Sequence, residues 1–173
     1  MQRILVIGCP GGGKTTFART LGDLLNIPVH HLDKHFWKEN WTPTPQNEFR
    51  EIQNQLMKEE RWIIEGNFTK SLDNRVPNAD TIIVLDLPKL VNIWRTLKRF
   101  IEHFGSVRPE MGGENKEALQ WKHIKYIVTF PRKEYLANIR SLAERKEAIV
   151  LRSPREVSEF LTSLRSQVSQ PAV

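Results

Sequence analysis

A segment near the amino terminus combines glycine, lysine and threonine at a spacing suited to holding phosphate. It reads GCPGGGKT from Gly8 to Thr15 and matches the pattern G-x-x-x-x-G-K-[ST] in full. Glycines let the backbone curl so that successive N–H groups point at phosphate oxygens. In this pattern the lysine meets the β- and γ-phosphates and the threonine hydroxyl ligates magnesium. The segment predicts a site for a nucleoside triphosphate and Mg²⁺, formed by Gly8, Gly11, Gly12, Gly13, Lys14, Thr15 and Thr16.

Three carboxylates each follow an apolar run that is typical of a strand. They are Asp33, Glu65 and Asp86. In parallel α/β sheets, ligands bind beyond the carboxyl ends of the strands, and the phosphate loop is itself such an end. Phosphoryl transfer needs a carboxylate near the metal, and a second one can orient an acceptor hydroxyl or take its proton. We expect Glu65 and Asp33 to serve these purposes, and Asp86 to be structural because Pro88 and a helix follow it.

Basic side chains gather in the second half of the chain. Arg95, Lys98 and Arg99 stand at i, i+3 and i+4 and therefore share one helix face. The opposite face is apolar, with Trp94, Leu97 and Ile101. A glycine-flanked loop carrying Arg108 comes next, and Arg132 lies further on. Arginines on a hinged loop suit a lid over a triphosphate, because closure excludes water and neutralises developing charge. The spacing is equally consistent with a solvated helix and an ordinary turn.

The order of elements along the chain supplies a frame for these side chains. Five segments rich in Val and Ile predict strands, namely 3–7, 28–32, 61–64, 81–85 and 148–151. Stretches of helical periodicity lie between and after them, namely 15–25, 45–60, 90–104, 115–129, 132–145 and 154–168. Most of the strands are continuously apolar, as in sheets covered on both faces. The alternation predicts an α/β fold of the P-loop NTPase type, with an open five-stranded parallel sheet between helices.

The composition is that of a soluble globular protein. Hydrophobic residues make up 39% and charged residues 27% of the 173 residues, and no apolar run is long enough to cross a membrane. The single cysteine, Cys9, cannot form an internal disulfide, which suits a reducing cytoplasm. Its thiol lies at a helix N-terminus and is either acidified or a small filler. The net charge of +6 favours anionic partners, and its dispersal favours phosphate ligands over nucleic acid.

Together these residues resemble the adenylate-kinase-like P-loop kinases, and most closely the bacterial topology-modulation (FlaR-related) proteins. The resemblance rests on ILVIGCPGGGKTTFARTLG, on HLDKHFW followed by Trp41, and on WIIEGNF and ADTIIVLD. It covers nearly the whole chain, and the stretches 31–41 and 62–68 are its most specific part. Family members usually have Asp-Gly-Asn-Tyr where this chain has EGNF at 65–68.

The resemblance implies a nucleoside-monophosphate-kinase-like fold, with residues 1–173 forming one domain and a helical lid at about 95–140. It puts Asp33 and Arg75 at the acceptor and Glu65 beside the magnesium. It assigns Arg95, Arg99, Arg108 and Arg132 to the lid, and the segment 152–155, which includes Arg155, to the adenine ring. The implied catalytic set is Lys14, Asp33, Arg95, Arg99 and Arg132.

Two functions of different classes fit these features. One is an ATP- and Mg²⁺-dependent kinase that transfers the γ-phosphoryl group to a nucleotide, nucleoside or other polar acceptor. The other is a nucleotide-binding regulator that contacts DNA through its basic surface and has little or no turnover. Acidic residues at three strand ends favour the kinase, and no motif points to the positioned water that a hydrolase needs. The aromatic residues Phe36, Trp37 and Trp41 are equally consistent with stacking on a base and with a hydrophobic cluster.

Overall fold

A five-stranded parallel sheet is the centre of the protein in a computed structural model that describes residues 1–105, 121–143, 146 and 148–169. Its strands lie in the order β2-β5-β1-β6-β7. They are β1 (Arg3–Gly8), β2 (Val29–His31), β5 (Trp62–Glu65), β6 (Thr81–Leu85) and β7 (Ala148–Leu151). Each neighbouring pair is parallel. The predicted α/β fold is therefore confirmed.

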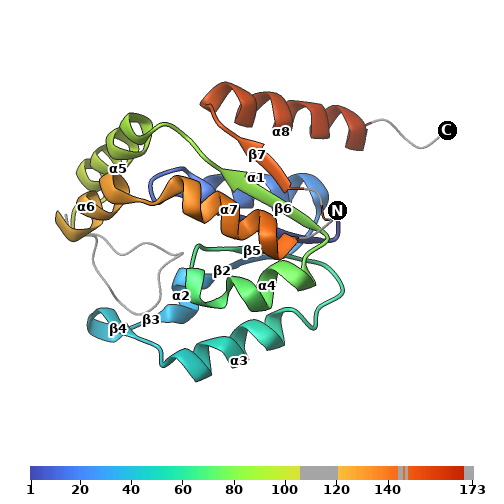
Figure 1. The fold of residues 1–173 in the computed structure, drawn as a ribbon. Helices are drawn as coiled ribbons and strands as arrows, with labels where there is room; N and C mark the ends of the chain where they lie inside the picture. The colour runs from blue at the N-terminus through green and yellow to red at the C-terminus, as the bar shows by residue number, and fades with distance from the viewer. Residues whose placement is uncertain (106–120, 144–145, 147, 170–173) are drawn as a thin grey trace.

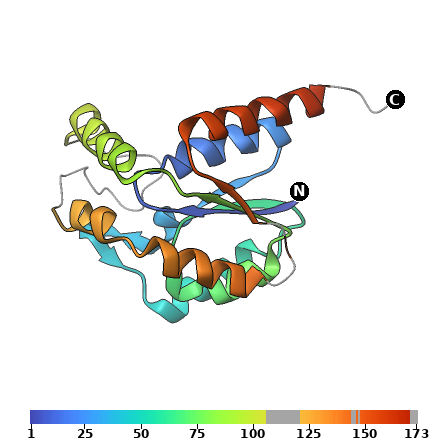
Figure 2. The same cartoon turned by 45° about the horizontal axis from the view of Figure 1, so that its top comes forward.

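Helices cover both faces of this sheet (Figures 1 and 2). One face carries α1 (Lys14–Leu25) and α8 (Pro154–Ser169), and its core includes Ile4, Val6, Phe17, Leu21 and Leu164. The other face carries α3 (Gln46–Leu56), α4 (Leu72–Asn78) and α7 (Arg132–Ala143), and its core includes Leu5, Ile7, Phe49, Val76 and Ile139. Successive residues of β1 thus alternate between two cores. This explains why the strand is apolar without interruption.

Three short elements between β2 and α3 have no counterpart in the sequence-based prediction. They are α2 (Leu32–Phe36), and the antiparallel pair β3 (Trp37–Lys38) and β4 (Thr42–Pro43). Short 3₁₀ turns occur at Glu39–Trp41 and Thr69–Ser71. The helix α4 was also not predicted. Of the helix predicted at 115–129, the structure describes α6 (Trp121–Thr129), and the rest lies outside the described residues.

The polar side of the helix α5 (Lys89–His103) faces the rest of the protein at the carboxyl end of the sheet. Asn92 and Thr96 are buried, whereas Trp94 and Ile101 on the apolar side are 66% and 75% exposed. The amphipathic pattern alone would favour the opposite orientation. The polar orientation matters for the site, because it brings Arg95 toward the phosphate loop. Among the residues that the structure describes, no helix combines the length and apolar character needed to cross a membrane.

Candidate active site

The carboxyl ends of the parallel strands bring the predicted residues to one edge of the sheet. The phosphate loop follows β1 in the middle, and Glu65 ends β5 beside it. Asp33 follows β2 on the far side of β5, and Asp86 follows β6 on the other side of β1. The register supports this order, since Glu65 pairs with both Val6 and His31. Glu65 therefore stands between the strand of Asp33 and the strand of the phosphate loop.

The phosphate loop has the backbone shape that its glycines predict. Gly11 and Gly13 have φ values of +77° and +84°, in the left-handed region that favours glycine. The amide of Gly12 donates to the carbonyl of Cys9 at 3.2 Å and closes the turn. Gly13 is the N-cap of α1 and supplies no side-chain cap, so the first amides of the helix lack the capping oxygen that a serine or aspartate would give. These amides, with Thr15 and Thr16 in the first turn, suit an anion.

The helix α5 packs directly against this loop. A Cβ atom at Gly11 would lie 2.4 Å from the carbonyl oxygen of Asn92, so no larger residue fits there. Arg95 Nη1 donates to the carbonyl oxygen of Gly12 at 2.9 Å. The guanidinium therefore already lies on the rim of the predicted phosphate site.

Lys14 and Cys9 interact within the loop. Lys14 Nζ donates to the carbonyl oxygen of Cys9 at 3.3 Å, a long bond that a phosphate oxygen can replace. The Cys9 side chain is 3% exposed, and burial raises the pKa of its thiol although the nearby Lys14 opposes this change. Of the two alternatives for Cys9, the geometry favours a packed, neutral thiol over an acidified one.

Glu65 forms a small polar cluster with Thr15 and His31. Its side chain is 4% exposed. Oε2 accepts from Thr15 Oγ1 at 3.3 Å and lies 3.1 Å from His31 Nδ1. A hydroxyl and a carboxylate side by side below the phosphate loop fit Mg²⁺, which binds through one or two protein oxygens, waters and substrate phosphates. Within the described ranges no set of three or more His, Cys, Asp or Glu side chains could hold a metal by itself.

Asn67 supports the loop and was not identified from the sequence. Its Oδ1 accepts from the amide of Gly8 at 2.9 Å and from the hydroxyl of Tyr135 at 2.8 Å. Burial raises the pKa of Tyr135, so its hydroxyl stays protonated and keeps donating. The only sequence signal for Asn67 was its place in the EGNF segment after β5.

The position of Arg75 does not fit the expected contact with an acceptor. Its side chain is fully buried, with an exposed fraction of 0%. The guanidinium donates to the carbonyl oxygens of Gly66, Asn67 and Phe68 at 2.6–3.0 Å. Burial lowers the pKa of Arg75 to about 10, so the group stays charged at neutral pH. Arg75 is a support for the loop that follows Glu65, because all of these contacts point into that loop.

Asp86 and Arg132 form an ion pair on the other side of the phosphate loop. Arg132 Nε donates to Asp86 Oδ1 at 2.8 Å, and Nη2 donates to the Asp86 carbonyl at 3.0 Å. The hydrogen bond from Arg132 to Asp86 raises the pKa of the guanidinium. Asp86 is thus the partner of Arg132, whereas the N-cap of α5 is Pro88. The pair fixes the start of α7 to the end of β6.

The remaining predicted residues occupy different surroundings. Asp33 lies half-buried in the first turn of α2, and Arg99 is half-buried on α5. Arg155 is exposed in the first turn of α8, where its Nε donates to Glu159 Oε1 at 2.7 Å. Arg108 lies outside the described residues.

Aromatic rings form a cluster beside Asp33. Phe36 packs against Phe68 and Phe49, with ring centroids 4.7 and 5.0 Å apart. Trp37 contacts Phe36 and Trp41 at 4.8 and 5.5 Å. These contacts show that the rings form a hydrophobic cluster, and Phe36 belongs to its inner part. The cluster holds α2, and with it Asp33, against the rest of the protein.

Neither a protein-family model nor a curated protein matches this chain. Several solved structures have a similar fold. A shikimate kinase from Bacteroides thetaiotaomicron has a TM-score of 0.55 and 15% identity, with 98% of this chain and 99% of that chain covered. A sugar kinase from Janibacter sp. has a TM-score of 0.57 and 17% identity, with the same shares covered. A gluconokinase from Sinorhizobium meliloti has a TM-score of 0.55 and 13% identity over 97% of this chain and 91% of that chain.

This chain has the fold of the P-loop kinases. The likeness extends along nearly all of each chain, so it covers the phosphate loop, the strand ends and the helices that follow β6. At these identities the likeness establishes the fold only. In such a fold the residues of the site decide the chemistry.

Proposed function

We propose that this protein is a kinase that transfers the γ-phosphoryl group of ATP directly to a small polar acceptor. The proposal rests on one arrangement: a complete phosphate loop lies beside the Thr15–Glu65 pair, and Asp33 follows the next strand along the same sheet edge. The names of the similar structures describe kinases of small molecules, which supports this acceptor class. The proposal includes the use of Mg²⁺, ATP as the phosphoryl donor, and Asp33 as the residue that contacts the acceptor.

Each residue of the site has a definite task in this proposal. The loop amides and Lys14 bind the phosphates, and Thr15 and Glu65 would hold Mg²⁺, which supplies charge neutralisation when bound. Asp33 orients the acceptor hydroxyl and takes its proton as the new O–P bond forms and the bond to the bridging oxygen breaks. Positive charge near the transferring group comes from arginines of α5 and α7, namely Arg95, Arg99 and Arg132.

The relation to topology-modulation proteins stays a prediction. The alternative of a DNA-binding regulator finds no support in the paired surface charges. Within the part of the chain that the structure describes, basic side chains that form ion pairs with carboxylates at the surface include Lys38, Arg50, Lys98 and Arg155. Such pairing reduces the positive field that a duplex would meet.

A screen for ADP release tests the proposed function. Nucleosides, nucleotides, sugars and hydroxylated acids are supplied with ATP and magnesium, and each reaction is repeated without the acceptor. We expect ADP release that depends on the acceptor and on magnesium, with matching phosphorylated product by mass spectrometry. Binding of ATP with no acceptor-dependent turnover across these classes would contradict the kinase and favour the regulator.

Asp33→Asn is expected to separate transfer from ATP binding. The amide keeps the shape of the carboxylate but cannot take a proton, so turnover should fall roughly 100-fold or more while the Kd for ATP stays unchanged. Asp23→Asn, an exposed change on α1, is the matched control. An equal loss of ATP affinity would put Asp33 in the metal site or the fold, and unchanged turnover would remove it from the acceptor site.

His31→Ala is expected to weaken magnesium use. The imidazole lies 3.1 Å from Glu65 Oε2 and holds the carboxylate in one orientation, the one in which it should bind the metal. Without the imidazole the carboxylate is free to rotate. Groups that orient a metal ligand typically contribute about 10-fold to metal affinity, and the magnesium concentration for half-maximal turnover should rise by that factor. His31→Asn, which restores a donor, should recover part of it.

The control for His31 is its neighbour. His30 contacts Glu59 at the surface, with a distance of 3.0 Å between Nε2 and Oε2, and points away from Glu65. His30→Ala should therefore leave the magnesium dependence unchanged. If His30→Ala and His31→Ala shifted it equally, the effect of His31 would be a general loss of strand β2.

A further inference from the structure

A cavity of about 260 Å³ lies between α7 and the edge strand β7. Its apolar lining includes Val84 and Val150 from the sheet and Leu136 and Ile139 from α7. Two arginines, Arg140 from α7 and Arg152 from the end of β7, complete the lining. No phosphate-loop residue and no carboxylate belongs to it. The cavity therefore shares no residue with the phosphate loop or the strand-end carboxylates, and its one link to the expected nucleotide site is Arg152, the first residue of the segment 152–155.

The topology explains why a hollow remains here. β7 is the last strand of the sheet, so it has a neighbour on one side only. α7 packs against α4 and covers β6, where Val84 is 1% exposed. Val150, on the same sheet face one strand further out, is only half-buried. The helix layer on this face thus ends before the sheet does, and the apolar floor of the outer strand stays accessible.

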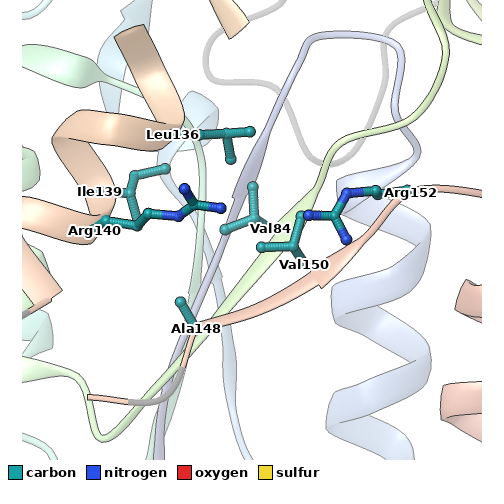
Figure 3. A pocket seen from close by; sticks show the side chains of 7 residues that line it. All are labelled: Val84, Leu136, Ile139, Arg140, Ala148, Val150 and Arg152. Carbon is teal, nitrogen blue, oxygen red and sulfur yellow. The ribbon is translucent and has the colours of Figure 1, made fainter. Parts of the chain in front are cut away.

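The two guanidinium groups point into this hollow from opposite sides (Figure 3). Neither donates a side-chain hydrogen bond or forms an ion pair with any residue that the structure describes. Arg50, Arg132 and Arg155, by contrast, each pair with a carboxylate. Two guanidinium groups directed into one hollow can both donate charge-assisted hydrogen bonds to an anion that lies between them.

We propose that this cavity binds a small organic anion, with a carboxylate or phosphate group between Arg140 and Arg152 and a short apolar body on the valine and isoleucine floor. Guanidinium forks bind both kinds of anion through paired, charge-assisted hydrogen bonds. The volume is smaller than that of a pocket for a drug-sized molecule, which limits the ligand to a single ring or a short chain. The proposal does not depend on kinase activity.

Methyl NMR of the full chain tests this site. Val, Leu and Ile methyl groups are ¹³C-labelled, and the protein is titrated with benzoate, phenyl phosphate, benzyl alcohol and inorganic phosphate. We expect benzoate or phenyl phosphate to shift the methyl signals of Val84, Ile139 and Val150, with a Kd of about 1 mM or below. Whichever of benzoate and phenyl phosphate binds more tightly shows whether the site prefers a carboxylate or a phosphate. Benzyl alcohol should not bind, because it lacks the charge.

Inorganic phosphate separates this cavity from the phosphate loop. It lacks the apolar body, so it should leave the cavity methyl groups unshifted at concentrations where phenyl phosphate shifts them. Shifts confined to residues around the phosphate loop would overturn the proposal. Equal binding of benzyl alcohol would overturn it as well, since the arginines would then contribute nothing.

Three single substitutions complete the test. Arg140→Ala and Arg152→Ala should each weaken binding about tenfold or more, because each removes a charge-assisted contact. Both side chains are exposed and unpaired within the described residues, so the thermal stability of the empty protein should barely change. Arg165→Ala changes an exposed residue on α8, and this variant should bind the anion as tightly as the unaltered protein does. Equal binding in all three variants would rule out an arginine-based site.

Discussion

Lys14→Ala should abolish most of the stabilisation that ATP gives this protein. The ammonium group meets the β- and γ-phosphates in a loop of this shape, and its loss should cost about 3 kcal/mol or more in the transition state. Turnover should therefore fall by roughly 100-fold or more. Without nucleotide the melting temperature should stay nearly unchanged, because the only described bond of Nζ is the 3.3 Å contact with the Cys9 carbonyl.

Thermal melts with and without magnesium and ATP measure this effect. At ATP concentrations near 100 times Kd, a bound nucleotide stabilises the folded state by about 2.7 kcal/mol. That gain should appear in the unaltered protein and in Lys58→Ala, a surface control, and should be largely absent in Lys14→Ala. Full ATP-dependent stabilisation of Lys14→Ala would contradict the assignment of the phosphate loop.

Arg75→Ala should have the largest effect on the stability of the empty protein. The change removes a buried charge together with its bonds to the carbonyls of Gly66, Asn67 and Phe68. The Phe68 carbonyl keeps the amide and hydroxyl of Ser71 as donors, whereas the other two lose the Arg75 guanidinium. Each such bond to a charged group contributes about 1.5–3 kcal/mol, so we expect a loss of at least roughly 3 kcal/mol in the free energy of unfolding. Urea unfolding followed by circular dichroism measures it.

Two comparisons sharpen the test of Arg75. Arg155→Ala removes an exposed pair within one helix and should cost less than about 1 kcal/mol. Arg75→Lys keeps a charge but not the planar fork, so it should recover only part of the loss. A stable Arg75→Ala protein whose turnover alone collapses would restore the acceptor role that the family resemblance implies.

The parts of the fold that the sequence predicted are those with local signals. The apolar runs at 81–85 and 148–151 gave the strands β6 and β7 with the observed bounds, and the glycine pattern gave the phosphate loop. The short helix α4 escaped prediction because its sequence, LDNRVPN, contains proline and two asparagines, which are poor helix formers. Its buried side chains Leu72 and Val76 hold it in place through contacts distant in the sequence.

The parts of the site that the sequence missed depend on such distant contacts. Asn67 meets Gly8 across 59 positions, and His31 meets Glu65 across 34. A motif gives the place of a residue in the chain but not the direction of its side chain, which is why Arg75 was expected at an acceptor and lies instead under a loop. The orientation of α5 also depends on distant contacts. Its polar face turns toward the phosphate loop, where the Asn92 carbonyl lies against Gly11 and Arg95 donates to the Gly12 carbonyl.

The order of strands has a consequence for synthesis on the ribosome. β1 is the central strand, yet its two neighbours begin at Trp62 and Thr81. At a translation rate of about 5–20 residues per second, the emerging chain carries an unpaired apolar strand for several seconds before either neighbour exists. Ile4, Leu5, Val6 and Ile7, all fully buried in the finished protein, are exposed during that interval. We therefore expect nascent chains shorter than about 80 residues to depend on chaperones for solubility, and parallel pairing to begin only after β5 has left the exit tunnel.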